Sequence, residues 1–471
     1  MKFYGRTEEL ETLSNQLPLL ENGSRLVVVT GRRRIGKTTL ITKFARESSL
    51  PSLYFFIQRG YSEDDLVKSC LTQIKRELNL KGFLPDISKL SELVEFCMQQ
   101  SKTTPLILIF DECQELDYAA PKFWSELQNV WDKNKNESRL LLIMSGSIIS
   151  AIKHIFSDAN EPLYGRTDLL LKIKPFSCHT IRQYLKEKNP NFTSEDLLMF
   201  YAMTGGVPRY MELLTSSGCS DVESFKKFLF SQASSWYRQD GYVILGNEFR
   251  MESSAYFSLL RAIAYGKTQW SELQNEVSTN LAPYMSRLET QFNLLKKNYP
   301  FGKKSSGRGT RYLLTDEYFR FWFKFIEPMT FASLYESSQW NLSEGLFDKA
   351  WPDFCGRTLE NWFLKDYSEN GAWTAVGQWW DKRGENEIDL VAVNELVDKI
   401  QFAEIKRNPK KIYLEKLQER AEVFLKNNPK YQKFSVSFKG LSLGDIKNLT
   451  NVLNLYKGKF KTLTKVIQSV R

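Results

Sequence analysis

Nearly continuous apolar runs alternate with helical patterns over residues 1–175. The runs lie at residues 26–29, 53–57, 106–110, 140–144 and 169–173. Such runs are typical of strands that are buried on both faces of a sheet. Between them, apolar residues recur at helical spacing, for example over 66–78 and 123–131. Strands that alternate with helices in this way predict an α/β domain built on a parallel sheet.

Residues 246–330 have a different pattern, with three short helices and then a hairpin. Helical spacing covers 256–264, 269–277 and 281–295, and a polar loop rich in Gly, Ser and Lys then returns as a strand. Three helices followed by a hairpin with a basic tip are typical of a winged-helix module. The aromatic-rich segment that follows is expected to form core.

The last part of the chain, residues 331–471, predicts a smaller α/β domain. A helical pattern begins at residue 356, and strand-like runs follow at 373–380, 384–393 and 399–408, with turns between them. We therefore expect an α/β domain at 1–175, a winged helix at 246–330 and a smaller α/β domain at 331–471.

Composition excludes several classes of protein. Of the 471 residues, 42% are hydrophobic and 25% are charged, as in a soluble globular protein, and no apolar run is long enough for a membrane helix. The six cysteines form no C-x-x-C pair and the chain has only two histidines. Zinc and disulfides are therefore unexpected, and a cytoplasmic location is expected. The net charge of +10 favours a polyanionic partner only weakly.

The most specific motif follows the first strand, where the sequence reads Gly-Arg-Arg-Arg-Ile-Gly-Lys-Thr-Thr. The pattern G-x-x-x-x-G-K-[ST] wraps backbone N–H groups around phosphate at a helix N-terminus. We expect Lys37 to reach the β- and γ-phosphates of ATP and Thr38 to bind Mg²⁺. The residues predicted to bind the nucleotide here are Gly31, Arg32, Arg33, Arg34, Ile35, Gly36, Lys37, Thr38 and Thr39.

Polar residues at later strand ends predict the rest of the catalytic machinery. Asp111 and Glu112 end the run at 106–110, and we expect Asp111 to support Mg²⁺ and Glu112 to activate the attacking water. Ser145 and Ser147 end the next run and either sense the γ-phosphate or simply form a turn. Arg166 is a candidate arginine finger, in cis or in trans, with a surface arginine as the alternative.

The order of these segments resembles the archaeal-type P-loop ATPase family, within the AAA+ and STAND-like group. The resemblance is carried by the start FYGRTEEL, the phosphate loop, LILIFDE, SGS, PLYGR and TGGVPRY, and it extends to a C-terminal domain of the kind called DUF234. It implies an extra strand between the loop strand and the Asp-Glu strand. It also implies that residues 1–175 form the ATPase domain, with Tyr4, Gly5 and Arg6 near the adenine. A helical lid at 176–245, bearing Pro208, would cover the nucleotide, with Arg209 a candidate lid sensor.

Two candidate sites in the second half concern DNA. In the winged-helix module, Lys303, Lys304, Arg308 and Arg311 are expected to contact DNA phosphates, and the alternative is a module that only packs domains together. The C-terminal domain resembles the PD-(D/E)xK nuclease-like core. The candidate nuclease residues are Glu360, Asp389, Glu404 and Lys406. If the strands pair, these carboxylates could hold a metal for phosphodiester hydrolysis, and the alternative is a folded but inactive relic.

The sequence therefore predicts an ATP-hydrolysing switch with Mg²⁺ as cofactor. Nucleotide state would move the lid, and the lid would move the C-terminal modules toward DNA binding, with metal-dependent cleavage as a further output. A second hypothesis is a protein-interaction switch with an inactive nuclease-like domain, and a third is a nuclease that ATP only regulates. The expected partners are nucleotide, DNA and a second copy of the chain, and no membrane.

Overall fold

The computed structural model describes residues 3–78, 86–147, 149–248, 253–303 and 309–447. The chain forms two compact units. One comprises Met1–Pro175 with Thr290–Phe292, and the other comprises Phe176–Glu289 and Asn293–Arg471. The five strands of the parallel sheet all belong to the first unit. The finer division of the second unit into lid, winged-helix and nuclease-like domains stays a prediction.

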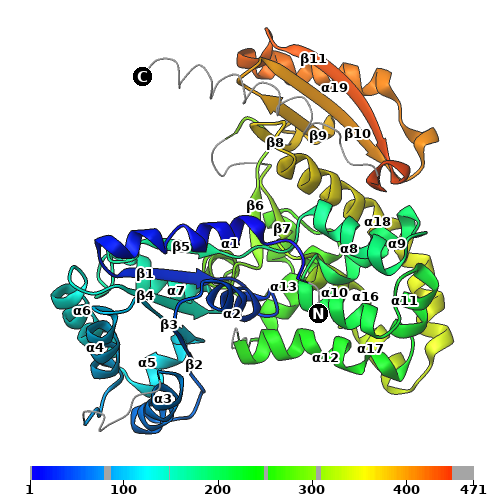
Figure 1. Ribbon diagram of the computed structural model, residues 1–471. Helices are drawn as coiled ribbons and strands as arrows, with labels where there is room; N and C mark the ends of the chain where they lie inside the picture. The colour runs from blue at the N-terminus through cyan, green and yellow to red at the C-terminus, as the bar shows by residue number, and fades with distance from the viewer. Residues whose placement is uncertain (1–2, 79–85, 148, 249–252, 304–308, 448–471) are drawn as a thin grey trace. The chain divides into compact units, whose positions relative to one another are not determined.

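The first unit is built on a five-stranded parallel sheet (Figure 1). Its strands are β1 (Arg25–Thr30), β2 (Ser52–Phe56), β3 (Leu106–Asp111), β4 (Leu140–Gly146) and β5 (Leu169–Lys172). The strands lie in the order β2-β3-β4-β1-β5, so that β4 separates the loop strand β1 from the Asp-Glu strand β3. This order confirms the predicted α/β fold and the extra strand.

Helices cover both faces of this sheet. They are α1 (Thr7–Ser14), α2 (Lys37–Glu47), α3 (Glu63–Glu77), α4 (Leu90–Ser101), α5 (Leu116–Ala119), α6 (Phe123–Asn134) and α7 (Ile149–Ser157). Leu108 and Leu142 point to the face that packs against α3, α4 and α6. Their strand neighbours Ile107 and Ile143 point the other way and are equally buried. Because successive side chains alternate between faces, burial at both explains the continuous apolar runs.

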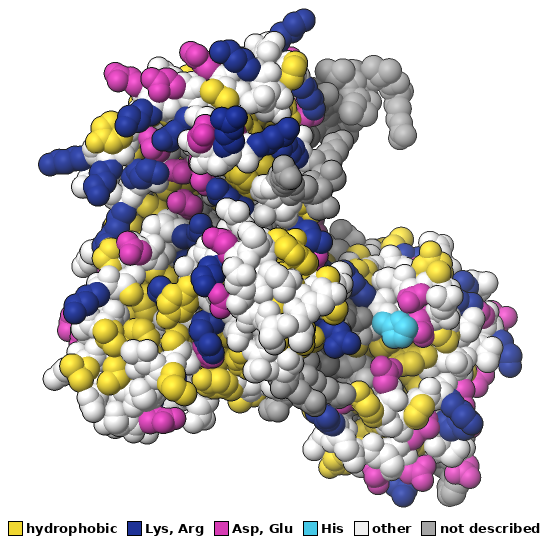
Figure 2. Space-filling view, turned by 180° about the vertical axis from the view of Figure 1, so that it is seen from behind, with side chains coloured by type: hydrophobic (Ala, Val, Ile, Leu, Met, Phe, Trp, Pro, Cys, Tyr) yellow, Lys and Arg dark blue, Asp and Glu magenta, His cyan; other side chains and the backbone are white. Residues whose placement is uncertain are grey.

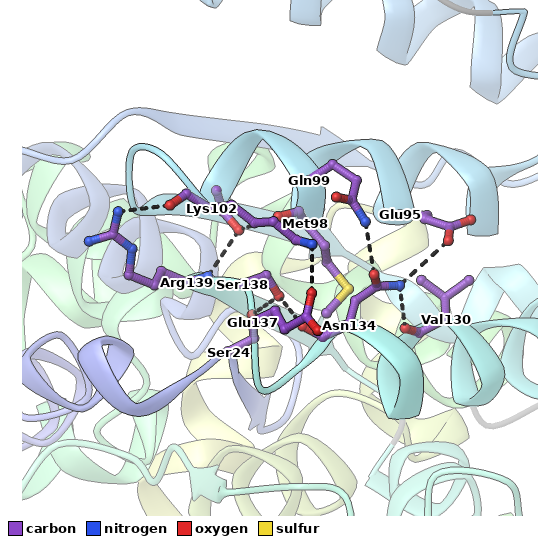
Figure 3. A network of polar contacts seen from close by, with 11 residues as sticks. Ser24, Glu95, Met98, Gln99, Lys102, Val130, Asn134, Glu137, Ser138 and Arg139 are labelled. Carbon is purple, nitrogen blue, oxygen red and sulfur yellow. Dashed lines mark hydrogen bonds and ion pairs between the residues drawn. The ribbon is translucent and has the colours of Figure 1, made fainter.

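A polar network fixes the starts of β1 and β4 (Figure 3). Ser24 Oγ lies 2.7 Å from Ser138 Oγ and accepts from the backbone N–H of Leu140. The Arg139 guanidinium donates to the carbonyl of Lys102 at the C-terminal end of α4. These bonds satisfy polar groups that would otherwise be buried without partners. They connect the starts of the strands, and the functional loops follow the opposite ends of the strands.

The second unit begins with a helical region. Its helices are α8 (Cys178–Lys188), α9 (Ser194–Thr204), α10 (Pro208–Ser216), α11 (Val222–Leu229) and α12 (Ser235–Val243), which continues as a π-helical turn to Glu248. Helix α9 is apolar on all sides, and its residues from Asp196 to Thr204 are buried. A helix of this kind lies inside a protein core. The predicted lid is therefore held within the second unit through α9.

Three helices and a hairpin follow, as in a winged-helix module. They are α13 (Ser254–Ala264), α14 (Trp270–Gln274), α15 (Ala282–Ser286), β6 (Leu295–Asn298) and β7 (Arg311–Leu314), with β6 and β7 antiparallel. The third helix was expected to reach Leu295. Instead α15 continues as a π-helical turn that ends at Gln291, and Leu295 begins β6. A buried leucine satisfies either periodicity, so the pattern alone did not separate the two elements.

Aromatic side chains then build the core of the second unit. The helices are α16 (Glu317–Phe325), α17 (Met329–Glu336) and α18 (Trp340–Glu369). Phe321 and Trp322 of α16 are fully buried, and Phe321 packs edge-on against Phe354 of α18. This confirms the expectation that the aromatic-rich segment forms core. Helix α18 begins well before the predicted residue 356 and tolerates Pro352 in its interior.

The C-terminal domain is a mixed four-stranded sheet between two helices. Its elements after α18 are β8 (Ala375–Trp380), β9 (Glu387–Asn394), β10 (Lys399–Lys406), α19 (Leu414–Asn427) and β11 (Ser435–Ser442). The strand order is β11-β10-β9-β8, with only β10 and β11 parallel. Helix α18 contacts β8, β9 and β10, and α19 contacts β9, β10 and β11. The order of helix and three strands is the one predicted from the sequence.

Candidate functional site

The phosphate loop connects β1 to α2, as predicted. Gly36 caps α2 with a φ of 90°, a left-handed conformation that glycine adopts without strain. A Cβ at Gly31 would lie 2.8 Å from the carbonyl oxygen of Ile173, so the close approach of β5 requires glycine there as well. Lys37 is buried, and its Nζ lies 3.0 Å from the carbonyl oxygen of Gly31. The lysine therefore lies folded across the loop.

The N-terminal segment lies directly against this loop. The Arg6 guanidinium donates to the carbonyl of Ile35 at 3.1 Å and pairs with Glu9 at 2.8 Å. Burial lowers the pKa of Arg6, and the Glu9 carboxylate opposes that shift. Lys43 of α2 lies over the ring of Phe3. The segment that carries Tyr4, Gly5 and Arg6 is thus brought to the loop, while its contact with adenine stays a prediction.

Asp111 forms the centre of a short hydrogen-bond chain beside the loop. Its carboxylate is buried, and Oδ2 accepts from Thr38 Oγ1 at 2.6 Å and from the Tyr54 hydroxyl at 2.8 Å. Burial and the Asp111 charge raise the pKa of Tyr54, which keeps the phenol protonated as a donor. A hydroxyl and a carboxylate side by side are the oxygen ligands that Mg²⁺ prefers. Thr38 and Asp111 therefore fit the predicted ion.

Glu112 is held in an unusual backbone conformation. Its φ of 55° lies in the left-handed region, which costs a non-glycine residue roughly 1–3 kcal/mol and recurs at functional sites. Its Oε2 accepts from Ser147 Oγ at 2.8 Å and from Gln114 Nε2 at 2.6 Å. The carboxylate is thus fixed by a residue at the end of β4 and by one two positions along its own chain.

The sequence did not single out Tyr54 and Gln114. Tyr54 lies in an apolar run, and Gln114 lies in a short turn after the Asp-Glu pair.

The packing around Gly146 explains why the SGS segment has glycine at its centre. A Cβ there would lie 2.5 Å from Gln114 Oε1 and would displace the side chain that holds Glu112. In the described residues, the buried Ser145 hydroxyl has no hydrogen-bond partner.

Arg166 lies at the end of the sheet where the parallel strands begin, whereas the phosphate loop lies at the end where they finish. Its guanidinium forms a two-pronged ion pair with Asp132 near the end of α6, with contacts of 2.7–3.2 Å. Nearby, the N–H of Asp168 donates to the carbonyl of Leu26 at the start of β1. The loop begins five residues later at Gly31, roughly 16 Å along the strand. Arg166 therefore does not reach a nucleotide bound in its own loop.

This position predicts the behaviour of an Arg166→Ala variant. In a dilute, monomeric sample, ATP turnover per chain should stay within about twofold of the wild-type rate, because the arginine contributes no charge to its own γ-phosphate. A role in trans would appear as a loss of turnover that grows with protein concentration. Steady-state ATPase rates over a dilution series test this. Loss of turnover at every dilution would contradict the placement.

Pro208 and Arg209 belong to the second unit. Pro208 is the first residue of α10, where a proline costs no hydrogen bond, and Arg209 pairs with Glu212 one turn later at 2.9 Å. The preceding Gly206 has a φ of 73°, and a Cβ there would lie 2.8 Å from the side chain of Ile181. The Gly-Gly-Val-Pro segment thus packs tightly within the helical region. Its contact with nucleotide stays a prediction.

In the C-terminal domain, the predicted acidic set partly converges. Lys406 Nζ lies 2.8 Å from Asp389 Oδ2 and 3.7 Å from Glu404 Oε1, so β9 and β10 bring these three side chains together. Glu360 of α18 is half-buried, and Gln378 Nε2 lies 3.5 Å from its Oε2. Burial, followed by the nearby Asp389 charge, raises the pKa of Glu360 to about 7.

These carboxylates are already engaged by the protein. Asp389 Oδ2 accepts from the N–H of Ile405 and from Lys406, and Glu404 Oε2 accepts from the N–H of Tyr413. Across the described part of the chain, no three or more Asp, Glu, His or Cys side chains are arranged to hold a metal ion. The residues do not fit a ready metal centre in this arrangement, and nuclease activity stays a prediction.

The hairpin formed by β6 and β7 packs on the C-terminal domain. Arg311, expected to contact phosphate, instead pairs through both nitrogens with Glu387 of β9 and lies over the ring of Trp380, 4.2 Å from its centroid. Trp380 Nε1 donates to the carbonyl of Gly309 at 2.8 Å. The N–H of Phe301 donates to the carbonyl of Gln378. These contacts favour the alternative reading of the hairpin as a packing element.

Of the other predicted hairpin contacts, only Lys303 is available in the structure. It is exposed, whereas Lys304 and Arg308 lie outside the described residues. With Arg311 paired to Glu387, the described cations that the hairpin exposes are Lys303 and Lys296 of β6, and Lys296 was not among the predicted contacts. The expected phosphate-binding hairpin is therefore not supported by the contacts of Arg311.

Known proteins match this chain over most of its length. An uncharacterized protein of Methanocaldococcus jannaschii is 27% identical over 456 residues, which cover 91% of this chain and 94% of the relative. The Walker-type ATPase of Pyrococcus abyssi has the same fold over 68% of this chain and 96% of its own, with a TM-score of 0.53 and 20% identity. The ORC2 protein of Aeropyrum pernix, solved with ADPNP and ADP, aligns over 71% of this chain and 96% of its own, with a TM-score of 0.48 and 15% identity.

The sheet order, the phosphate loop and the Asp-Glu strand end define a P-loop ATPase. Residues 3–214 match the family described as an ATPase domain predominantly from Archaea. Residues 322–419 match a second family, DUF234, described as archaeal and bacterial proteins of unknown function. Among the helices of the described residues, none has both the length and the apolar character needed to cross a bilayer.

Proposed function

We propose that this ATPase is a nucleotide-driven switch whose output lies in the C-terminal domain and is exerted on DNA. The observation that carries the proposal is the way the lid helices are fastened to that domain. Arg182 of α8 pairs with Asp366 of α18 at 2.7 Å, and both side chains are at least nine-tenths buried. Arg182 Nε also donates to the carbonyl of Ile446. A lid anchored in this way carries the C-terminal domain with it.

A second contact links the lid to the strand that carries the predicted catalytic pair. Arg407 forms an ion pair with Glu195 of α9. It directly follows Lys406, which contacts both Asp389 and Glu404. Tyr201 of α9 packs edge-on against Trp362 of α18, with ring centroids 5.0 Å apart. Helix α9 therefore contacts the residue that follows β10, and both lid helices contact the helix that bears Glu360.

Hydrolysis would supply the energy for the switch. Lys37 and the loop N–H groups would bind the phosphates, and Thr38 and Asp111 would hold Mg²⁺, which neutralises charge on the β- and γ-phosphate oxygens. Glu112, fixed by Ser147 and Gln114, would orient the attacking water and accept its proton. Because ATP and ADP differ in their contacts with these groups, each would favour a different lid position.

Hydrogen exchange of the full chain tests the proposal. We expect the amides of β10 and α18 to exchange at different rates with ADP and with a non-hydrolysable ATP analogue, because lid and domain move together. Glu195→Gln, which removes the ion pair with Arg407, should reduce the difference in exchange rate at β10 between the two nucleotide states. ATP turnover should stay unchanged. Equal exchange in both states, in a protein that hydrolyses ATP, would contradict the switch.

A protein-interaction switch is the second candidate output. It is favoured by the docked hairpin and by Lys406, which pairs with the carboxylates that a nuclease would need for a metal. Incubation of the full chain with DNA and Mg²⁺ or Mn²⁺, beside an Asp389→Ala variant, tests for cleavage, and a full chain that binds no DNA would leave the protein-interaction output. Cleavage that depends on Asp389 would support a nuclease, and intact DNA would restrict the output to binding.

A further inference from the structure

A short connection after β10 places three lysines and a tyrosine on the surface. Lys410, Lys411, Tyr413 and Lys416 are all exposed, and 55% of the Tyr413 surface is accessible. In the described residues, the three lysines form no ion pair with a carboxylate. Lys416 Nζ lies 5.3 Å from the centroid of the Tyr413 ring. These four residues are called the basic surface below.

The basic surface directly adjoins the carboxylate and lysine group. The N–H of Tyr413 donates to Glu404 Oε2 at 3.0 Å, so the backbone of the surface is bonded to that carboxylate. Arg420, one turn after Lys416 on α19, has its Nη1 3.7 Å from Glu404 Oε1. Lys416 and Arg420 are four residues apart and lie on one side of the helix. Positive charge therefore runs from the connection along α19 past Glu404.

An acidic row bounds this surface. Glu415, Glu419 and Glu422 are exposed and share another side of α19 at helical spacing. The cations thus gather on the side of α19 that adjoins Glu404 and not over the whole helix. Figure 2 shows many Lys and Arg side chains over the upper part of the view, where the C-terminal domain lies. The cations of the basic surface are therefore separated from those elsewhere on the domain by this acidic row.

We infer that the basic surface binds the phosphodiester backbone of nucleic acid, with an unpaired base stacked on Tyr413. Lysines neutralise phosphates without reading sequence, and an exposed aromatic ring stacks on bases. An exposed ring among unpaired lysines favours a nucleic acid over an acidic protein, because a nucleic acid offers a base for stacking as well as phosphates. The inference rests on the proposed C-terminal output and moves the DNA contact from the hairpin to the end of β10.

Fluorescence anisotropy of the full chain, with a short labelled single strand and the matching duplex, tests this surface without added nucleotide. The triple variant Lys410→Ala, Lys411→Ala and Lys416→Ala should bind both at least about tenfold more weakly at low salt. In a plot of the logarithm of the binding constant against the logarithm of the salt concentration, the slope should become shallower by about 2 for the single strand. It should become shallower by somewhat more for the duplex. Tyr413→Ala should weaken single-strand binding about fivefold and leave duplex binding unchanged.

A matched triple variant controls for lost charge. Lys399, Lys426 and Lys433 are exposed lysines at the other end of the domain, where β10 and β11 begin, and their replacement by alanine should leave DNA binding unchanged. Equal losses of DNA affinity in both triple variants, or no loss in the first, would overturn the proposed binding surface. So would wild-type protein that binds polyglutamate or anionic vesicles but no DNA. Failure of the switch would appear separately, as nucleotide-independent hydrogen exchange.

Discussion

Glu112→Gln should lower the rate of ATP hydrolysis by roughly 10²–10⁴-fold, the contribution expected of a general base. The amide keeps the size of the carboxylate and can still accept the hydrogen bond from Ser147. It cannot take a proton from water. ATP binding should be unchanged, because Glu112 is not one of the groups expected to bind phosphate. Single-turnover hydrolysis, with nucleotide affinity measured on the same sample, checks both parts.

Two further variants sharpen this result. Glu8→Gln changes an exposed glutamate on α1 and should hydrolyse ATP at the wild-type rate. Ser147→Ala leaves the Glu112 carboxylate held by Gln114 alone, so it should lower turnover by less than Glu112→Gln and leave binding intact. Wild-type turnover in Glu112→Gln would show that another group activates the water. Loss of binding in the same variant would assign Glu112 to the nucleotide and not to the water.

The parallel sheet could be predicted because its signals are local. Each buried strand is a continuous apolar run, and Asp111 and Glu112 mark where one of them ends. The phosphate loop is equally local, since the glycines and Lys37 are set by the backbone path around phosphate. The sequence did not show which polar side chains on different strands contact each other. Tyr54 and Asp111 are 57 residues apart, and only strand pairing makes them neighbours.

Arg166 illustrates a different limit. Its place in the sequence leaves open an arginine finger in cis, one in trans and a surface arginine, but a parallel strand starts at one end of the sheet and finishes at the other. The functional loops follow strand ends, such as Thr30 and Asp111, whereas Arg166 precedes a strand start. Consequently it lies beside Asp132, near the end of α6. Strand direction, which the sequence order already contained, was the missing step.

The contacts between lid and C-terminal domain had no sequence signal at all. Arg182 and Asp366 are 184 residues apart, and each alone looks like a surface charge on an amphipathic helix. Likewise, Arg407 follows the E-x-K motif without belonging to it. Such pairs depend on the tertiary arrangement, so a single sequence gives no reason to join them. They are nevertheless the contacts on which the proposed switch depends.

Arg182→Met should destabilise the second unit by about 3–5 kcal/mol, because it leaves the Asp366 carboxylate buried without its cation. That loss is a large part of the roughly 5–15 kcal/mol by which domains are usually stable. Methionine also removes the hydrogen bond to the Ile446 carbonyl and the charge over the ring of Trp362. Urea unfolding followed by tryptophan fluorescence, with and without ATP, should shift mainly a transition that ATP does not stabilise.

The double variant Arg182→Met with Asp366→Leu separates stability from coupling. Apolar side chains of similar volume often replace a buried ion pair at little cost, so much of the lost stability should return. The nucleotide-dependent exchange difference in α18 should nevertheless stay reduced, since the directional link between α8 and α18 is gone, while ATP turnover continues. A double variant that regains stability and keeps the full exchange difference would show that packing around Trp362, and not the ion pair, transmits the change.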